Sequence, residues 1–292
     1  MAEDILLKMA CHLHRQTGLK ALCMAGGVAL NSVANGRILR ETAFEDLFIQ
    51  PAAGDSGGAV GAAFYAWHVL LGKPRTFVME HAYLGQGYDA NALADFLHES
   101  SIPHESYEDD EKLLERLVED LTAGKVIGWF QGRFEWGPRA LGNRSILADP
   151  RRAEMKGIVN AKIKFREPFR PFAPVLPEER ARESFLGLSN PARQYPARFM
   201  LQVLPWKNSA GNLVPAVNHA GTGRVQTLRA EWNPRYFRLV ELFGEATGIP
   251  ILMNTSFNLR GEPMVASPAD AWNTFTKSGL DVLVMGNHVV RK

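Results

Sequence analysis

The sequence lacks the features that mark secreted, membrane and nucleic-acid-coating proteins. Cys11 and Cys23 are the only cysteines in 292 residues, too few for a disulfide framework, so we expect reduced thiols and a cytoplasmic location. No apolar run approaches the length of a membrane span, and the first residues include acids where a signal peptide would be apolar. The formal net charge of +2 argues against general nucleic-acid binding.

Positive charge is nevertheless concentrated in one stretch, residues 126–175. Between Arg133 and Arg170 there are ten Lys or Arg against four Asp or Glu, so the rest of the chain is net acidic. Glycines and prolines, Pro168 among them, lie between the charges and favour loops of fixed shape. Planar guanidinium groups match phosphate and carboxylate oxygens in pairs. The stretch therefore predicts an anion-binding site rather than a plain solvated face.

The first seventy residues contain two successive strand–glycine–helix units. Apolar spacing predicts a helix over 3–17, a strand over 21–24 and a helix over 28–39, with Gly26 and Gly27 at the turn. A second strand, 46–50, leads through Asp55 to a helix over 59–71. Such turns let backbone N–H groups approach a phosphate or a nucleotide. We expect Asp55 to cap its helix, with a metal or a sugar hydroxyl as the alternative.

These units resemble the nucleotide-binding half of the actin, Hsp70 and sugar-kinase fold. A complete fold of that kind needs two related lobes, and these residues would supply only the closing part of the second. We therefore expect the chain to be truncated relative to its relatives. A boundary is expected at residues 72–75, which divides the chain into a partial lobe, 1–75, and a second domain, 76–292.

Helices and strands alternate through the second domain, which predicts the α/β class. Helices are expected over 90–100, up to 122, and over 151–163, 233–247 and 270–279. Strands are expected over 126–130, 145–148, 172–176, 198–204 and 249–253, and as a pair within 281–290. Asn233 should cap its helix with Pro234 at the first helical position. Residues 81–87 are expected to be irregular.

Polar residues gather at two places in the last third of the chain. One is an expected turn between two strands, and the other is the end of the strand over 249–253. The residues are Asn218, His219, Arg224 and Gln226 at the turn, and Asn254, Ser256 and Asn258 at the strand end. Short polar side chains at a strand end are a usual ligand position in α/β folds. Turn chemistry by Asn and Ser is an equally weighted alternative.

Six runs of sequence resemble the O-carbamoyltransferases of nodulation and antibiotic tailoring. They are MAGGVALNSVANGRI, QPAAGDSGGAVGAA, YLG, FQGRFEWGPRALGNRSILADPR, KFREPFRPFAPV and NTSFNLRGEP. The resemblance implies that residues 1–75 are the end of an actin-like carbamoyl-transfer domain and that 76–292 form a complete YrdC-like mixed-sheet domain. The second domain would form carbamoyl adenylate from carbamoyl phosphate and ATP. The first would transfer the carbamoyl group to a hydroxyl of a sugar, antibiotic or nodulation-factor-like acceptor.

The resemblance also implies roles for particular residues. Those expected to act in catalysis are Lys164, Arg170, Arg224 and Ser256. Those expected to bind substrate or nucleotide are Arg139, Arg144, Arg166, Asn254, Asn258, Gly26, Gly27 and Asn31. Asp55 matches a metal ligand of the transfer domain. Glu135, the one acid inside its motif, is expected to form a salt bridge with a neighbouring arginine.

The expected small molecules are ATP with Mg²⁺, carbamoyl phosphate and the hydroxylated acceptor. Fe²⁺ or another divalent metal belongs to the full transfer site, whose paired histidines have no counterpart here. His12 and His14 do not replace them, because residues two apart on a helix do not share a face. The sequence leaves open whether the chain forms a homo-oligomer.

Two other functions are alternatives to carbamoyl transfer. An RNA-binding or tRNA-modification module would need a more basic chain than this one. A sugar-kinase relative would need a phosphate-binding first lobe.

Overall fold

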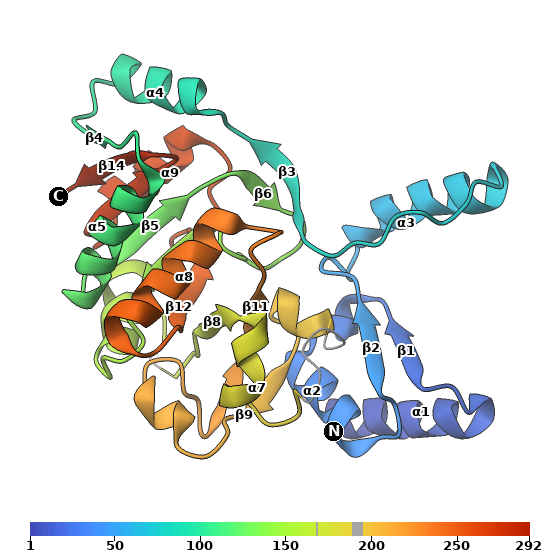
Figure 1. The fold of residues 1–292 in the computed structure, drawn as a ribbon. Coiled ribbons are helices and arrows are strands. Elements are labelled where there is room, and N and C mark those ends of the chain that lie inside the picture. The colour runs from blue at the N-terminus through green and yellow to red at the C-terminus, as the bar shows by residue number, and fades with distance from the viewer. Residues whose placement is uncertain (168, 189–194) are drawn as a thin grey trace.

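A mixed sheet of eight strands forms the centre of the larger body in the computed structural model, which describes residues 1–167, 169–188 and 195–292 (Figure 1). Its strand order is β11-β8-β12-β7-β5-β13-β14-β4. The pairs β11·β8 and β13·β5 are parallel and the other neighbours are antiparallel. The strands are β4 Glu105–Ser106, β5 Ile127–Phe130, β7 Arg144–Ala148, β8 Ala173–Pro177, β11 Gln226–Leu228, β12 Leu252–Ser256, β13 Val282–Met285 and β14 His288–Arg291. The expected α/β class with a mixed sheet is confirmed.

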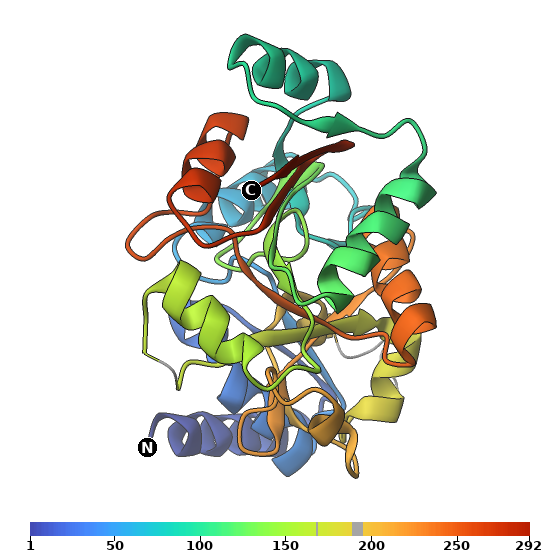
Figure 2. The ribbon, with the colours of Figure 1, turned by 90° about the vertical axis from the view of Figure 1, so that its left-hand side faces the viewer.

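Helices cover both faces of this sheet (Figure 2). Helices α5 Asp110–Thr122 and α8 Pro234–Thr247 lie on one face, and α6 Met155–Val159 and α9 Pro268–Thr276 lie on the other. Along β5, Ile127 and Trp129 pack in the core on the α5 and α8 side, whereas Phe130 packs in the core on the other. All four residues of β13 are buried, as expected for a strand covered on both faces. Asn233 caps α8 as predicted, by accepting the N–H of Tyr236.

The N-terminal unit is built on a second, parallel sheet of two strands. Its elements are α1 Ala2–Thr17, β1 Ala21–Met24, η1 Gly27–Leu30, α2 Ser32–Glu41, β2 Asp46–Ile49, α3 Gly57–Tyr65 and η2 Ala66–Leu70. Helix α3 and its continuation η2 extend away from the rest of the molecule (Figure 1). Tyr65, Trp67, Val69 and Leu70 are exposed there, although a helix apolar on all sides is normally buried.

The N-terminal unit packs against a segment late in the sequence, η6 Tyr195–Phe199 and β9 Val203–Pro205. The Nδ2 of Asn35 donates to the carbonyl of Leu201 at 3.0 Å. The ring of Phe48 stacks on Tyr195 with 4.6 Å between centroids. The remaining elements are β3 Tyr83–Gly87, α4 Ala90–Glu99, β6 Arg133–Glu135, η3 Asn160–Lys164, η4 Glu178–Arg180, α7 Ala181–Ser184, η7 Ala210–Leu213 and β10 Thr222–Arg224.

Several element predictions were wrong. Residues 198–204 do not form one strand, because Tyr195 and Phe199 are placed by a short helix in the same apolar cluster and β9 begins only at Val203. Residues 81–87 are not irregular, since β3 pairs with β6. The four polar residues expected at one turn are divided: Asn218 and His219 precede β10, Arg224 ends β10, which pairs with β9, and Gln226 begins β11, which pairs with β8. Pro168 lies outside the described residues.

Candidate anion-binding site

Residues from separate segments meet at one edge of the eight-stranded sheet. Strand β12 runs antiparallel to β7 and β8, so that Ser256 pairs with Ser145 near the start of β7 and Asn254 pairs with Ala173 at the start of β8. The chain entering β7 carries Arg139, the chain entering β8 carries Arg166 and Arg170, and β10 carries Arg224. Together they enclose a cavity of about 260 Å³. Its lining is Pro138, Arg139, Ala140, Arg166, Arg170, Pro171, Met200, Arg224, Thr255 and Ser256.

A second cavity of about 180 Å³ adjoins the first and shares Arg166, Arg170 and Ser256 with it. It adds Lys164 and Asn258, so seven of the residues predicted from sequence line these two cavities, which we call the arginine pocket. Arg260 also lines it and was not predicted. Its signal was present, because it is a cation inside the NTSFNLRGEP run.

Lys164 is buried at the end of η3, where Phe165 turns the chain with a positive φ of 45°. Its ammonium donates to the carbonyl and hydroxyl of Ser256 at 2.5 and 3.1 Å. It also donates to the carbonyl and side-chain oxygens of Asn258 at 3.0 and 2.7 Å. None of these acceptors is charged. Burial, and to a lesser degree the nearby Arg166, lower the pKa of Lys164 to about 7.

The side chains of Arg139 and Arg224 have no hydrogen bond or ion pair with any residue that the structure describes, and the Nε of each is buried. Burial lowers the pKa of both side chains, and Arg139 and Arg166 lower that of Arg224 further. Arg166 donates to Asn160 at 2.9 Å, again a neutral acceptor. Arg170 is exposed and pairs with Glu167 at 2.9 Å. Desolvated cations without a counter-charge make this pocket favourable for an anion.

Among the residues of the second domain that were expected to bind substrate, two, Arg144 and Asn254, lie outside the arginine pocket. Arg144 is fully buried; its guanidinium lies 3.8 Å from the ring centre of Phe130 and donates to the main-chain carbonyls of residues 86, 131, 132 and 143. Asn254 is also fully buried, and its Nδ2 donates to Gln226 at 2.6 Å and to the carbonyl of Ala140 at 3.3 Å. Asn254 therefore binds the carbonyl of Ala140, which lines the pocket, whereas Arg144 binds main chain that does not line it.

Glu135 does not form the expected salt bridge within the described residues. One oxygen of its buried carboxylate accepts the N–H groups of Leu141, Asn143 and Arg144 at 2.7, 2.8 and 3.2 Å. The prediction was wrong because the guanidinium of Arg144 is directed to main-chain carbonyls instead.

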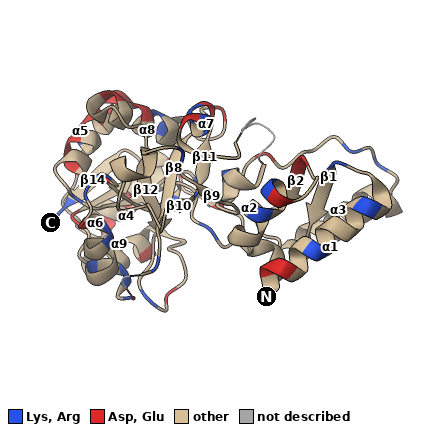
Figure 3. Cartoon of the chain, turned by 90° about the horizontal axis from the view of Figure 1, so that it is seen from below, with Lys and Arg blue, Asp and Glu red and all other residues tan. Residues whose placement is uncertain are grey.

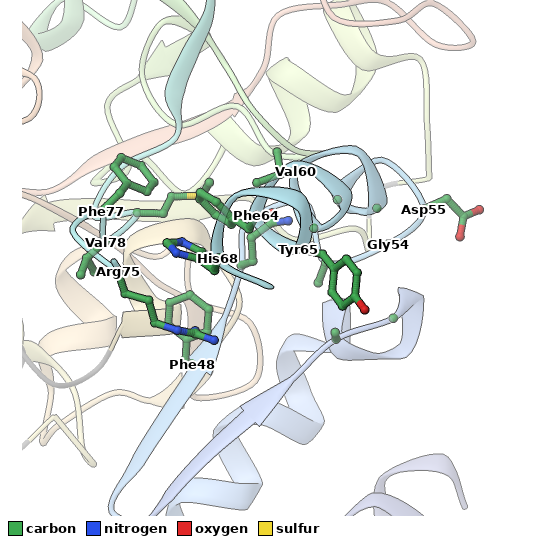
Figure 4. A pocket seen from close by; sticks show the side chains of 18 of the residues that line it. Phe48, Gly54, Asp55, Val60, Phe64, Tyr65, His68, Arg75, Phe77 and Val78 are labelled. Atoms are coloured by element: carbon green, nitrogen blue, oxygen red, sulfur yellow. The ribbon is translucent and has the colours of Figure 1, made fainter. Parts of the chain in front are cut away.

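The glycine turns of the N-terminal unit form a separate feature. Gly26 and Asp55 line an open groove of about 930 Å³, together with aromatic residues such as Phe48 and Phe64 (Figure 4). Gly27 and Asn31 do not line it, and Asn31 instead caps α2 by accepting the N–H of Ala34 at 3.2 Å. Neither turn contributes to the arginine pocket.

Asp55 is exposed and points away from the aromatic side of the groove (Figure 4). The preferred interpretation as a helix cap was wrong, because Ser56 precedes α3 and no side chain caps that helix. No cluster of three or more His, Cys, Asp or Glu side chains that could hold a metal ion occurs in 1–167, 169–188 or 195–292. A divalent metal at Asp55 therefore does not fit the described residues.

Two further observations concern the distribution of charged residues and the apolar character of the helices. Acidic and basic residues are interspersed along the elements of the larger body (Figure 3). Of the helices that the structure describes, none has the length and apolar character to cross a membrane.

Comparison with known proteins gives a consistent family relationship. A family model described as Carbamoyltransferase N-terminus matches residues 1–64, and one described as Carbamoyltransferase C-terminus matches 118–292. Nodulation protein NolO of Bradyrhizobium diazoefficiens is 42% identical over 99% of this chain and 53% of its own length. NolNO of Sinorhizobium fredii is also 42% identical, over 99% of this chain and 42% of its own length.

The similarity extends to a relative that is named as an O-carbamoyltransferase. The 3'-hydroxymethylcephem-O-carbamoyltransferase of Amycolatopsis lactamdurans is 34% identical over 91% of this chain and 48% of its own length. The chain thus spans about half the length of the curated relatives that it matches. Among solved structures, HypF in its phosphate- and nucleotide-bound form superimposes with a TM-score of 0.44 at 17% identity, over 65% of this chain and 23% of HypF.

Proposed function

The chain belongs to the carbamoyltransferase family, and we propose that its arginine pocket binds ATP and carbamoyl phosphate and forms carbamoyl adenylate. The observation that carries the proposal is a set of cations that line the arginine pocket without a counter-charge: buried Lys164, and Arg139 and Arg224, whose Nε atoms are buried. Such charges are costly to bury, and phosphate groups would neutralise them. Mg²⁺ would enter as part of the nucleotide substrate.

The proposed chemistry has two balanced steps. Water first takes the phosphoryl group from carbamoyl phosphate, which leaves carbamate and inorganic phosphate. A carbamate oxygen then attacks the α-phosphorus of ATP, the bond from that phosphorus to the bridging oxygen breaks, and pyrophosphate leaves. Carbamoyl adenylate, pyrophosphate and phosphate are the products.

In this reaction the residues of the pocket act by position and charge. Negative charge builds on the bridging and terminal phosphate oxygens as the bond to the α-phosphorus breaks. Arg139 comes from the chain before β7 and Arg224 from β10, and Lys164 is held in place by Ser256 and Asn258. Fixed cations in a site from which water is partly excluded stabilise that charge more strongly than solvated ones would.

We assign the formation of carbamoyl adenylate and the later transfer of the carbamoyl group to different parts of the molecule. Residues 76–292 would form the YrdC-like adenylate domain, and 1–75 would be the end of an actin-like domain that transfers the carbamoyl group to a hydroxylated acceptor. The chain alone should bind ATP without carbamoylating an acceptor. A cytoplasmic location agrees with the two free cysteines and with ATP as substrate. Light scattering tests whether the chain forms a homo-oligomer.

Calorimetric titration with ATP tests the pocket directly. The replacement Arg224→Ala should weaken binding by about tenfold or more, the loss expected for one charge-assisted contact. Lys162→Ala is the matched control, because it removes an exposed lysine two residues from Lys164 that does not line the pocket. Equal affinity in both variants, with equal melting points, would contradict the assignment.

A further inference from the structure

The carboxylate of Glu135 organises the loop that carries Arg139. This loop, residues 136–144, leaves the end of β6 and returns to the start of β7. One oxygen of Glu135 accepts N–H groups from both ends of the returning segment, at Leu141 and Arg144, and from Asn143 between them. A charged acceptor binds N–H groups more strongly than a neutral one. The loop therefore closes around a side chain that immediately precedes it.

Neutral side chains from other segments donate hydrogen bonds to carbonyls of the same loop. The hydroxyl of Tyr83 and the amide of Gln226 donate to the carbonyl of Leu141 at 2.8 and 2.7 Å. The indole of Trp129 donates to the carbonyl of Gly142 at 2.8 Å. These groups bind carbonyls, whereas Glu135 accepts three N–H groups of the loop. The hydroxyl of Ser145 accepts a fourth, that of Gly142, at 3.0 Å. Ser145 is a neutral acceptor, so Glu135 supplies the charged one.

Arg139 depends on this loop for its position. Its side chain has no hydrogen bond or ion pair within the described residues, so no side chain there fixes its direction. It nevertheless lines the arginine pocket with a buried Nε. Its placement must therefore come from the conformation of the main chain that carries it.

We propose that Glu135 is a positioning residue, which holds Arg139 in the arginine pocket through the main chain of residues 136–144. The inference rests on the proposed function, since it gives Glu135 a task in the binding of the phosphate groups of ATP. Glu135 itself does not line the pocket and would not touch the substrate. A role limited to stabilising the fold is the competing explanation.

A double-mutant cycle on the full chain separates the two explanations. ATP affinity is measured by calorimetry for the wild type, Glu135→Gln, Glu135→Ala, Arg139→Ala and the two double variants. Arg139→Ala should weaken ATP binding by about tenfold or more. Glu135→Ala should cause a similar loss, and Glu135→Gln a smaller one, because the amide keeps one acceptor oxygen in place. In the Arg139→Ala background, neither change at Glu135 should cost more than about a further twofold.

The outcomes are distinct. Losses that multiply in the double variants, or Glu135 variants that bind ATP like the wild type while Arg139→Ala does not, would overturn the positioning role and leave the proposed function standing. If Glu135→Ala does not fold, the cycle with Glu135→Gln decides alone. Unchanged affinity in Arg139→Ala would contradict the assignment of this arginine to the phosphate site, and the role of Glu135 with it.

Discussion

Binding of ATP should be accompanied by uptake of a proton at Lys164. Burial lowers the pKa of this lysine to about 7, and its hydrogen-bond acceptors, Ser256 and Asn258, are neutral. The other charged groups that line the same cavity are Arg166, Glu167, Arg170 and Arg260. A phosphate group placed there would raise the pKa of the ammonium, because an opposite charge at close range favours the charged form.

The size of the effect follows from the pKa. With a free-protein value of about 7, roughly a quarter of Lys164 is protonated at pH 7.5 and about 3% at pH 8.5. If the bound complex keeps the proton, affinity for ATP should fall about eightfold over this interval. Histidine and the terminal phosphate of ATP have mostly lost their protons by pH 7.5, so they contribute little to this change.

The stability of the free protein should show the opposite trend with pH. Because the folded pKa lies below the unfolded value of 10.5, only the unfolded chain holds this proton between pH 7 and 10.5. The unfolding free energy contributed by Lys164 therefore rises with pH in that window, and its burial cost is fully present below about pH 7.

Calorimetry in two buffers of different ionisation enthalpy measures the proton uptake. Near pH 8 the wild type should take up close to one proton per ATP, whereas Lys164→Ala should take up none and should lose the steep pH dependence. The control Lys162→Ala should behave like the wild type. Zero uptake by the wild type, together with an affinity that is flat between pH 7.5 and 8.5, would refute the reasoning.

Three further predictions concern stability. Gly142→Ala should destabilise the fold by about 2–6 kcal/mol, because φ is +110° and the added Cβ would lie 2.1 Å from the ring of Tyr236. An unchanged midpoint of urea denaturation would contradict this. Arg224→Met should weaken ATP binding by about tenfold or more and raise the unfolding free energy by about 1 kcal/mol, since it removes a partly buried charge without a partner. A lower melting point would count against that charge being unpaired. Trp67→Glu should change the free energy of unfolding by less than about 0.5 kcal/mol, because the side chain is 48% exposed. Light scattering should show less self-association of this variant. A large loss of stability would mean that the indole is buried in solution.

The sequence predicted those elements whose pattern is local. Helix α8 was found because Asn233 and Pro234 mark its start and apolar residues recur on one face. The strand ending at Ser256 was found because a buried run is followed by short polar residues. The helix at Tyr195–Phe199 was missed because its residues are all buried, and an apolar segment without periodicity can be either a helix or a strand.

The arginine pocket could be predicted only in outline. The concentration of arginine indicated an anion site, but Arg139 and Arg144 belong to the same run and have different surroundings. Arg139 lines the cavity and Arg144 is buried outside it, because the loop turns around Glu135. Local sequence does not encode which side chains a loop will turn inward, since that depends on partners such as Tyr83 and Gln226, far away in the chain.

The central claim is that the arginine pocket forms carbamoyl adenylate, and release of pyrophosphate tests it most directly. The purified chain is incubated with ATP and Mg²⁺, with and without carbamoyl phosphate, and pyrophosphate is measured. We predict release that depends on carbamoyl phosphate, that is lost in Arg224→Ala and that persists in Lys162→Ala. Release that is independent of carbamoyl phosphate, or equal in wild type and Arg224→Ala, would contradict the account.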